Sequence, residues 1–216
     1  MERVIASREA IGEAARRSGP QRRYWAMVGN GANRIAAEEL RIKLSELCYK
    51  AIACDATEDK KHIDLSSEPL ILVCAAGLRG STADDVAKEV AIYSAHKAAA
   101  IVIANEDEKR FTSATDVLPV PVVHDRLAFI MSTVVGHLFG YEAALAIDAQ
   151  AQPLRVARAV IEGVVVDGVV PDSVLGALKV TLQQPAHKFF DELRSGKLNG
   201  HLEASTASQL ATGFRY

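Results

Sequence analysis

The chain has few cysteines, and their arrangement excludes several kinds of site. Cys48, Cys54 and Cys74 are an odd number, lie in apolar segments and lack the CxxC spacing of zinc sites and redox motifs. They are therefore predicted to be reduced thiols in the core. The histidines show no metal-ligand spacing either, so neither a metal nor a cofactor is predicted.

The chain also has little net charge and no long apolar run. Its formal net charge is -2, which provides no electrostatic footprint for nucleic acid or for an anionic membrane. No apolar run reaches the length of about 18 residues that a membrane-spanning helix needs. The N-terminal stretch is charged and amphipathic, without the apolar centre of a signal peptide. We expect a cytoplasmic protein without nucleic-acid or membrane partners.

What the chain does contain is an alternation of continuous apolar runs with helical patterns, which is typical of a parallel sheet covered on both faces. The predicted strands are residues 24–28, 51–54, 70–75, 100–104 and 117–120, and the predicted helices are residues 33–49, 82–97 and 126–148. The expected fold class is α/β, a doubly wound five-stranded parallel sheet. Pro119 and Pro121 cannot donate ladder hydrogen bonds, which places the fifth strand at an edge.

The remaining segments flank this sheet. Residues 1–20 are predicted to form a connector helix that ends at Gly19-Pro20, residues 21–162 the α/β domain, and residues 163–216 a C-terminal extension. Within the extension, VVVDGVV predicts a short strand or hairpin, and HKFFDELRSGK predicts a short helix.

A fold of this kind binds ligands beyond the carboxyl ends of its strands. The loop after the first strand, Gly29-Asn30-Gly31, opens a helix and could hold a phosphate on its backbone N–H groups. A tight turn that needs glycine is the alternative. Arg34 occupies the third glycine position of a dinucleotide fingerprint, although Asp55 could still hold a ribose, so a dinucleotide-binding module is a further alternative.

The loop after the third strand offers a second anion site. Arg79, Gly80, Ser81 and Thr82 stand at a helix start, where hydroxyls, a guanidinium and the helix dipole suit a phosphate monoester. Ser81 or Thr82 could instead be a plain helix N-cap.

A third set of residues is suited to acid/base chemistry. Lys43 and Glu46 lie three residues apart on one helix face, and His62 follows in a polar loop. A carboxylate, a cation and an imidazole can move protons on a small molecule. The alternative is a solvated ion pair and an ordinary surface histidine.

Three stretches carry a resemblance to a known family: GNGANRIAAEELRIKLSELCY, the DKKH after the next strand, and LFGYEAALAIDAQAQPLRVARAVIE. From about residue 23 to residue 162 the chain resembles a sugar isomerase (SIS) domain, in particular the second SIS half of the isomerase domain of glucosamine-6-phosphate synthases, which are glutamine:fructose-6-phosphate aminotransferases. The family has a KLKEISY core sixteen residues ahead of a histidine. Here KLSELCY keeps both the motif and that gap, with Glu46 and His62 in register.

The resemblance implies roles for these residues. Glu46 would move the proton between C1 and C2 of an open-chain hexose 6-phosphate, Lys43 would assist it, and His62 would help open the sugar ring, in a neighbouring subunit's site. Gly80 and Thr82 match the family's phosphate loop SxSGxT, whereas Gly77 and Arg79 replace its two serines.

The resemblance also marks departures. Arg158 stands where the family has a Schiff-base lysine, and a guanidinium stays protonated and cannot form that imine. Neither a first SIS half nor a glutaminase domain is recognised in the chain. Two versions follow: the isomerase part of an aminotransferase, working as a homodimer or with another SIS or glutaminase subunit, or a non-catalytic phosphosugar-binding or assembly subunit.

Overall fold

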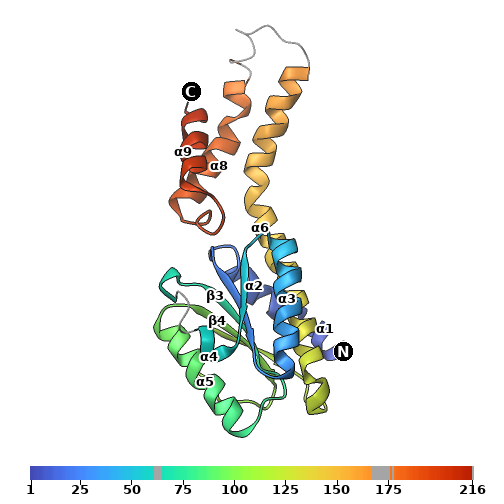
Figure 1. Cartoon of the computed structure of the whole chain (residues 1–216). Coiled ribbons are helices and arrows are strands. Elements are labelled where there is room, and N and C mark those ends of the chain that lie inside the picture. Colours follow the sequence, from blue (N-terminus) through green and yellow to red (C-terminus); the bar gives the residue numbers. More distant parts are fainter. Residues whose placement is uncertain (61–64, 167–175, 177, 216) are drawn as a thin grey trace. The chain divides into compact units, whose positions relative to one another are not determined.

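The structure is a computed structural model that describes residues 1–60, 65–166, 176 and 178–215 (Figure 1). The chain forms two compact units, Met1–Ala146 and Ile147–Tyr216. The first holds the sheet, and the second consists of helices. The helix α6, Ala128–Val166, belongs to both units.

Unit 1 is built on a five-stranded sheet in the order β2-β1-β3-β4-β5, and all of its pairings are parallel. The strands are β1 Trp25–Gly29, β2 Ile52–Asp55, β3 Leu70–Cys74, β4 Ala99–Asn105 and β5 Asp116–Val120. Every residue of β1, β3 and β4 is buried, as expected for central parallel strands. The predicted α/β fold with a doubly wound parallel sheet is confirmed, and β5 with its proline lies at an edge.

Helices cover both faces of this sheet (Figure 1). Those of unit 1 are α1 Glu2–Ala6, α2 Arg8–Ser18, α3 Ala32–Cys48, α4 Thr57–Lys60 and α5 Gly80–Ala95, with 3-10 turns η1 Leu65–Ser67 and η2 Asp125–Leu127. On one face, Val86, Val90 and Tyr93 of α5 belong to the same core cluster as alternate strand residues. On the other face, Trp25 of β1 makes an edge contact with Phe139 of α6 at 6.4 Å between ring centroids.

Helix α6 packs closely on α3. A Cβ at Gly136 would collide with the side chain of Leu40, and one at Gly140 would lie 2.5 Å from Cδ1 of Leu44. The two glycines therefore serve helix packing within one subunit. By length and composition alone, the segment Asp125–Gly163 could cross a membrane, but the complete burial of residues such as Phe139 shows that its first half is a core helix.

The segment predicted as one N-terminal connector helix is two helices that break at Ser7, whose hydroxyl donates to the carbonyl of Val4 at 2.8 Å. Both helices belong to unit 1. Glu142 of α6 is largely buried and accepts hydrogen bonds from Arg8 at 2.8 Å and Arg16 at 3.2 Å. These two ion pairs join α2 to the helix that covers the sheet.

Unit 2 contains the end of α6 together with α8, Gln183–Arg194, and α9, Ala204–Gly213. Its centre is an aromatic cluster in which Phe189 lies 5.6 Å from Phe190 and 5.3 Å from Phe214 between ring centroids. The predicted short helix in this region is confirmed. The predicted strand is wrong for residues 164–166, which are the last turn of α6, and the rest of that segment lies outside the described residues.

Candidate functional site

The direction in which successive strands are added to the sheet reverses between β1 and β3. The chain leaves β1 toward β2 on one side, and it leaves β3 toward β4 on the other. In open parallel sheets this switch point, at the carboxyl ends of the strands, is the place where ligands bind. The candidate site is therefore formed by the loops that follow β1 and β3.

Glycine is required at two positions, the last residue of β1 and the loop that follows it. A Cβ at Gly29 would collide with the backbone carbonyl of Asn33, and Gly31 has a φ of +57° with no atom within 4 Å of a Cβ position. Asn30, between them, is fixed by Thr57, because its Nδ2 donates to Oγ1 at 2.6 Å and its Oδ1 accepts from the backbone N–H at 3.1 Å. This loop is consequently tied to the segment after β2.

Asn33, in the first turn of α3, links the two loops of the switch point. Its Nδ2 donates to the carbonyl of Ala76 at 2.8 Å, and its Oδ1 accepts from the hydroxyl of Ser132 on α6 at 2.9 Å. The residue is 3% exposed. A buried amide with both ends bonded fixes the spacing between the loops.

The loop after β3 exposes the start of α5. Gly77 has a φ of +75°, and its N–H donates to Oδ1 of Asn105 at the end of β4 at 3.0 Å. Gly80 has a φ of +53° and begins α5, so Arg79 is the N-cap and makes no side-chain capping bond. The interpretation of Ser81 or Thr82 as a plain N-cap is therefore wrong. Both of these hydroxyl side chains are exposed.

Arg79 is the cation best placed to meet an anion here. Its guanidinium pairs with Asp125 at 3.2 Å, and both of these side chains are exposed. The neighbouring Arg110 instead binds Asp84 and Glu108, each at 2.7 Å, and these hydrogen bonds raise its pKa. An exposed pair exchanges readily with a ligand, whereas a doubly paired guanidinium is occupied.

A cavity of about 190 Å³ lies beside Arg79. Its lining residues are Leu78, Arg79, Gly80, Asn105, Asp107, Glu108 and Arg110. The two carboxylates make the cavity itself unfavourable for a phosphate, because like charges repel. The exposed first turn of α5, which has no acidic residue, is the better anion site.

The structure separates the acid/base residues from these loops. Lys43 and Glu46 pair with each other at 3.2 Å, with side chains 47% and 61% exposed. Glu46 lies 14 residues beyond the start of α3, about 21 Å along its axis. Because α3 begins at the carboxyl end of β1 and runs back along the sheet, Glu46 lies toward the amino ends of the strands, away from the switch point.

Two further candidates lie elsewhere. Arg158 is on α6 in unit 2, where its Nε donates to Glu162 at 2.7 Å. His62 lies outside the described residues. One copy of the chain thus brings the loop after β1 and the start of α5, Arg79–Thr82, to the carboxyl ends of the strands. It does not bring Lys43 and Glu46 to them. The catalytic and binding roles of all these residues stay predictions.

The end of β2 is already occupied by a side chain of the protein. Arg34 donates to the carbonyl of Cys54 at 3.2 Å and to Glu38 at 3.0 Å. A dinucleotide would place its ribose beside Asp55 at this point. The arginine therefore both replaces the third glycine of the fingerprint and lies next to the ribose position.

Sequence reasoning did not select Asn33, Asn105 or Asp125, which shape this edge of the sheet. Asn105 is the last residue of β4, and Asp125 lies in the first turn after β5. Listing every polar residue at a strand's carboxyl end would have found Asn105, whereas Asp125 lies beyond the end of β5 at Val120. Among residues 1–60, 65–166, 176 and 178–215, no cluster of three or more histidine, cysteine or acidic residues is arranged to hold a metal.

No protein-family profile matches the sequence, and no curated protein matches it. Solved structures do match the fold. The C-terminal domain of glucosamine-fructose-6-phosphate aminotransferase from Francisella tularensis is similar with a TM-score of 0.59 and 17% identity, over 67% of this chain and 41% of that chain. Tagatose-6-phosphate ketose/aldose isomerase from Escherichia coli is similar with a TM-score of 0.54 and 20% identity, over 66% and 40%.

A third similar structure is the sugar isomerase domain of an RpiR transcription factor from Sphaerobacter thermophilus, with a TM-score of 0.50 and 19% identity, over 72% of this chain and 85% of that chain. The chain spans only about two fifths of the first two structures. At these identities the likeness establishes the fold. The predicted resemblance is confirmed at that level: the chain has the fold of an SIS, or sugar isomerase, domain.

Proposed function

We propose that this chain is a phosphosugar-binding SIS domain that holds a hexose 6-phosphate at the amino end of α5. The observation that carries the proposal is the start of this helix directly after β3, with Arg79, Ser81 and Thr82 exposed around Gly80. Free N–H groups of a first helical turn, two hydroxyls and a guanidinium are a set of donors that suits a phosphate monoester.

The loop after β1 would then contact the sugar. Space is open at both Gly31 and Gly80, where a Cβ would meet no atom within 4 Å. Asn33 keeps the two loops at a fixed spacing, so the site is already organised before a ligand arrives. Two of the similar structures are named for fructose 6-phosphate and tagatose 6-phosphate chemistry, which supports a hexose 6-phosphate as the ligand class.

In the catalytic version of this proposal, the chain isomerises a hexose 6-phosphate as the aminotransferase family does. Glu46 would transfer the proton between C1 and C2, with Lys43 and His62 assisting. Because Glu46 is exposed and lies toward the amino ends of the strands, a second SIS domain has to bring it to a ligand. Burial by that partner would also raise the basicity of the carboxylate.

A non-catalytic phosphosugar-binding subunit is the second candidate. Arg158, at the position of the family's Schiff-base lysine, is engaged by Glu162 and stays protonated. One similar structure is the sugar isomerase domain of a transcription factor. Binding without turnover fits both observations.

Ligand-induced stabilisation tests the proposal. Trp25 is the only tryptophan and is buried in β1, so its fluorescence reports the unfolding of unit 1. Fructose 6-phosphate and glucosamine 6-phosphate should raise the unfolding midpoint, while fructose should not. At a hundredfold excess over Kd the stabilisation is about 2.7 kcal/mol. Stabilisation by NAD alone, or by none of these compounds at millimolar concentration, would contradict the proposal.

A further inference from the structure

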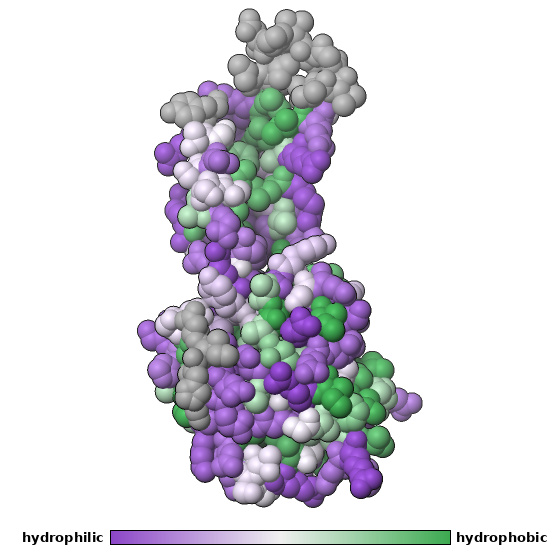
Figure 2. Space-filling view, viewed as in Figure 1, coloured by the Kyte–Doolittle hydropathy of each residue, from purple (hydrophilic) through white to green (hydrophobic). Residues whose placement is uncertain are grey.

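Unit 2 contains a cavity of about 570 Å³ between the end of α6, the α8 region and the end of α9. Its lining residues are Ile161, Leu178, Lys179, Leu182, Gln183, Ala186, His187, Phe190, Gly213, Phe214 and Arg215. This volume is in the range of sites that bind small organic molecules. Figure 2 shows hydrophobic residues gathered along the boundary between α6 and α8, with hydrophilic residues on both flanks.

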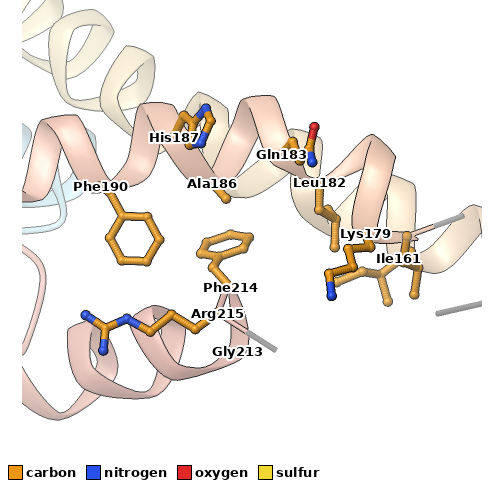
Figure 3. A pocket seen from close by; sticks show the side chains of 11 residues that line it. Ile161, Lys179, Leu182, Gln183, Ala186, His187, Phe190, Gly213, Phe214 and Arg215 are labelled. Atoms are coloured by element: carbon orange, nitrogen blue, oxygen red, sulfur yellow. The ribbon is translucent and has the colours of Figure 1, made fainter. Parts of the chain in front are cut away.

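The walls of the cavity are apolar and partly aromatic. Phe190 of α8 and Phe214, just after α9, face the same space and make an edge contact at 6.4 Å between ring centroids (Figure 3). Ile161 of α6 is 43% exposed although it lines this space. Apolar side chains that stay accessible inside a concave surface favour the binding of an apolar group.

The charges around the cavity have one sign. Lys179 and Arg215 line it toward opposite ends of the row of side chains in Figure 3, and the described lining contains no acidic residue. Within the part of the chain that the structure describes, neither cation forms an ion pair within 4.0 Å. Two cations beside an apolar space are complementary to an anion with an apolar body.

A neighbouring cavity of about 450 Å³ provides a contrast. It shares Ile161, Leu182 and Phe214 with the first, but its arginine, Arg158, is paired with Glu162 at 2.7 Å. The charge there is already compensated within the protein. An anionic group therefore belongs in the first cavity.

We propose that the cavity lined by Phe190, Phe214, Lys179 and Arg215 binds an amphipathic organic anion, an apolar chain or ring that carries one carboxylate. The apolar part lies between the phenylalanines and Leu182, and the carboxylate meets Lys179 or Arg215 at the rim. The site lies within unit 2, whereas the proposed phosphosugar loops lie in unit 1. The two sites are therefore distinct.

Titration calorimetry of the whole chain with decanoate, below its micellar concentration, tests the proposal. Decanoate should bind saturably with one molecule per chain. The double variant Lys179→Gln/Arg215→Gln should weaken decanoate binding at least tenfold and leave the binding of neutral decanol within about twofold. Both substituted side chains are exposed, so the helices should keep their circular dichroism spectrum.

A matched control is Lys188→Gln/Arg194→Gln, which removes one lysine and one arginine from α8 without touching the cavity lining. It should bind decanoate as the unmodified chain does. Absence of saturable binding, or equal losses in both double variants, would overturn the proposal. So would a dimer, seen by light scattering, that excludes decanoate and dissociates in Leu182→Glu, because a second copy would then occupy the cavity.

The same protein can be titrated with fructose 6-phosphate through Trp25 fluorescence. The variant Lys179→Gln/Arg215→Gln should leave that response unchanged. Failure of decanoate binding with an intact sugar phosphate response would remove this inference alone, and the reverse outcome would remove the proposed function alone.

Discussion

Asn33 donates a 2.8 Å hydrogen bond to the backbone carbonyl of Ala76 and so joins the first turn of α3 to the loop after β3. The two loops that flank the switch point of the sheet are thereby held together by one buried side chain. Its other end accepts from Ser132, which connects the same point to α6. The candidate site thus rests on a polar contact inside the core.

Replacement of this amide should destabilise unit 1. Asn33→Ala leaves the carbonyl of Ala76 and the hydroxyl of Ser132 without their partner, at a cost of about 1–3 kcal/mol in unfolding free energy. Urea unfolding followed by Trp25 fluorescence measures it. Lys88→Ala, which removes an exposed pair with Asp85, should change stability by less than about 0.5 kcal/mol. Equal effects of the two substitutions would show that the buried bonds contribute little.

Removal of the exposed guanidinium should weaken sugar phosphate binding. Arg79→Ala is expected to cost about 1.5–3 kcal/mol in the binding free energy of fructose 6-phosphate, the range of a charge-assisted hydrogen bond. Asp125→Asn is the matched control, because it frees Arg79 from its competing carboxylate and should keep or raise the affinity. Calorimetry decides, and an unchanged affinity in Arg79→Ala, or an equal loss for neutral fructose, would show that Arg79 does not contact phosphate.

Because α6 packs closely on α3, substitution of the glycines at this contact should destabilise the protein. Gly140→Ala places a methyl group 2.5 Å from Cδ1 of Leu44, which is fully buried, and should destabilise unit 1 by about 1–3 kcal/mol. Gly163→Ala, on the same helix but with no atom within 4 Å of its Cβ position, should leave the Trp25 transition unchanged and increase helicity by circular dichroism. A neutral Gly140→Ala would mean that the two helices can separate without cost.

The buried Lys50 should make stability depend on pH. Burial lowers its pKa from 10.5 to about 8, although its ammonium donates to the carbonyl of Arg22 at 2.7 Å and lies 5.3 Å from the centroid of the Trp25 ring. Between these two pKa values the unfolded state binds the proton and the folded state does not. The free energy of unfolding therefore rises with pH over this window.

Burial also raises the pKa of the neighbouring Cys48 thiol to about 11, which lowers stability as pH rises above the ordinary value of 9.0. The measurement therefore belongs in a Cys48→Ala background. There, Lys50 should add about 1–2 kcal/mol of stability between pH 8 and 10 relative to Lys50→Met. Parallel pH profiles of the two proteins in urea would contradict this expectation.

Loss of the candidate base should separate binding from turnover. Glu46→Gln keeps the shape of the side chain and removes its basicity, so isomerase activity should vanish while fructose 6-phosphate affinity stays within a few-fold. The assay needs a second copy or another SIS subunit. Full activity of Glu46→Gln would show that Glu46 is not the base and that it forms only an exposed ion pair with Lys43.

A second measurement mixes two inactive variants to test whether two copies of the chain share a site. Inactive Glu46→Gln and inactive His62→Ala proteins should together recover part of the activity if each site uses residues from two copies. Light scattering checks the underlying prediction of a homodimer. A 23.2 kDa monomer that sugar phosphate leaves unchanged would confine shared-site chemistry to a complex with another subunit.

The sheet could be predicted from local pattern because its central strands are buried on both faces and read as unbroken apolar runs. LILVC of β3 and AAIVIAN of β4 are examples. The local pattern predicted the helix after the last strand to end at residue 148, and the structure extends this helix, α6, to Val166. Pro153 lacks an N–H and ordinarily ends a helix, yet α6 continues through it to Val166.

The amino-acid sequence alone was enough to predict the central strands, the fold class and the glycine positions at the switch point, because these depend on local apolar pattern and backbone dihedral freedom. Which polar residues meet depends instead on how the helices pack on the sheet. Asn33 reaches Ala76 across 43 positions in the chain, and Glu46 lies toward the amino ends of the strands, away from Arg79. Side chains distant in sequence converge through the packing of helices on the sheet, and no spacing within one segment encodes that contact.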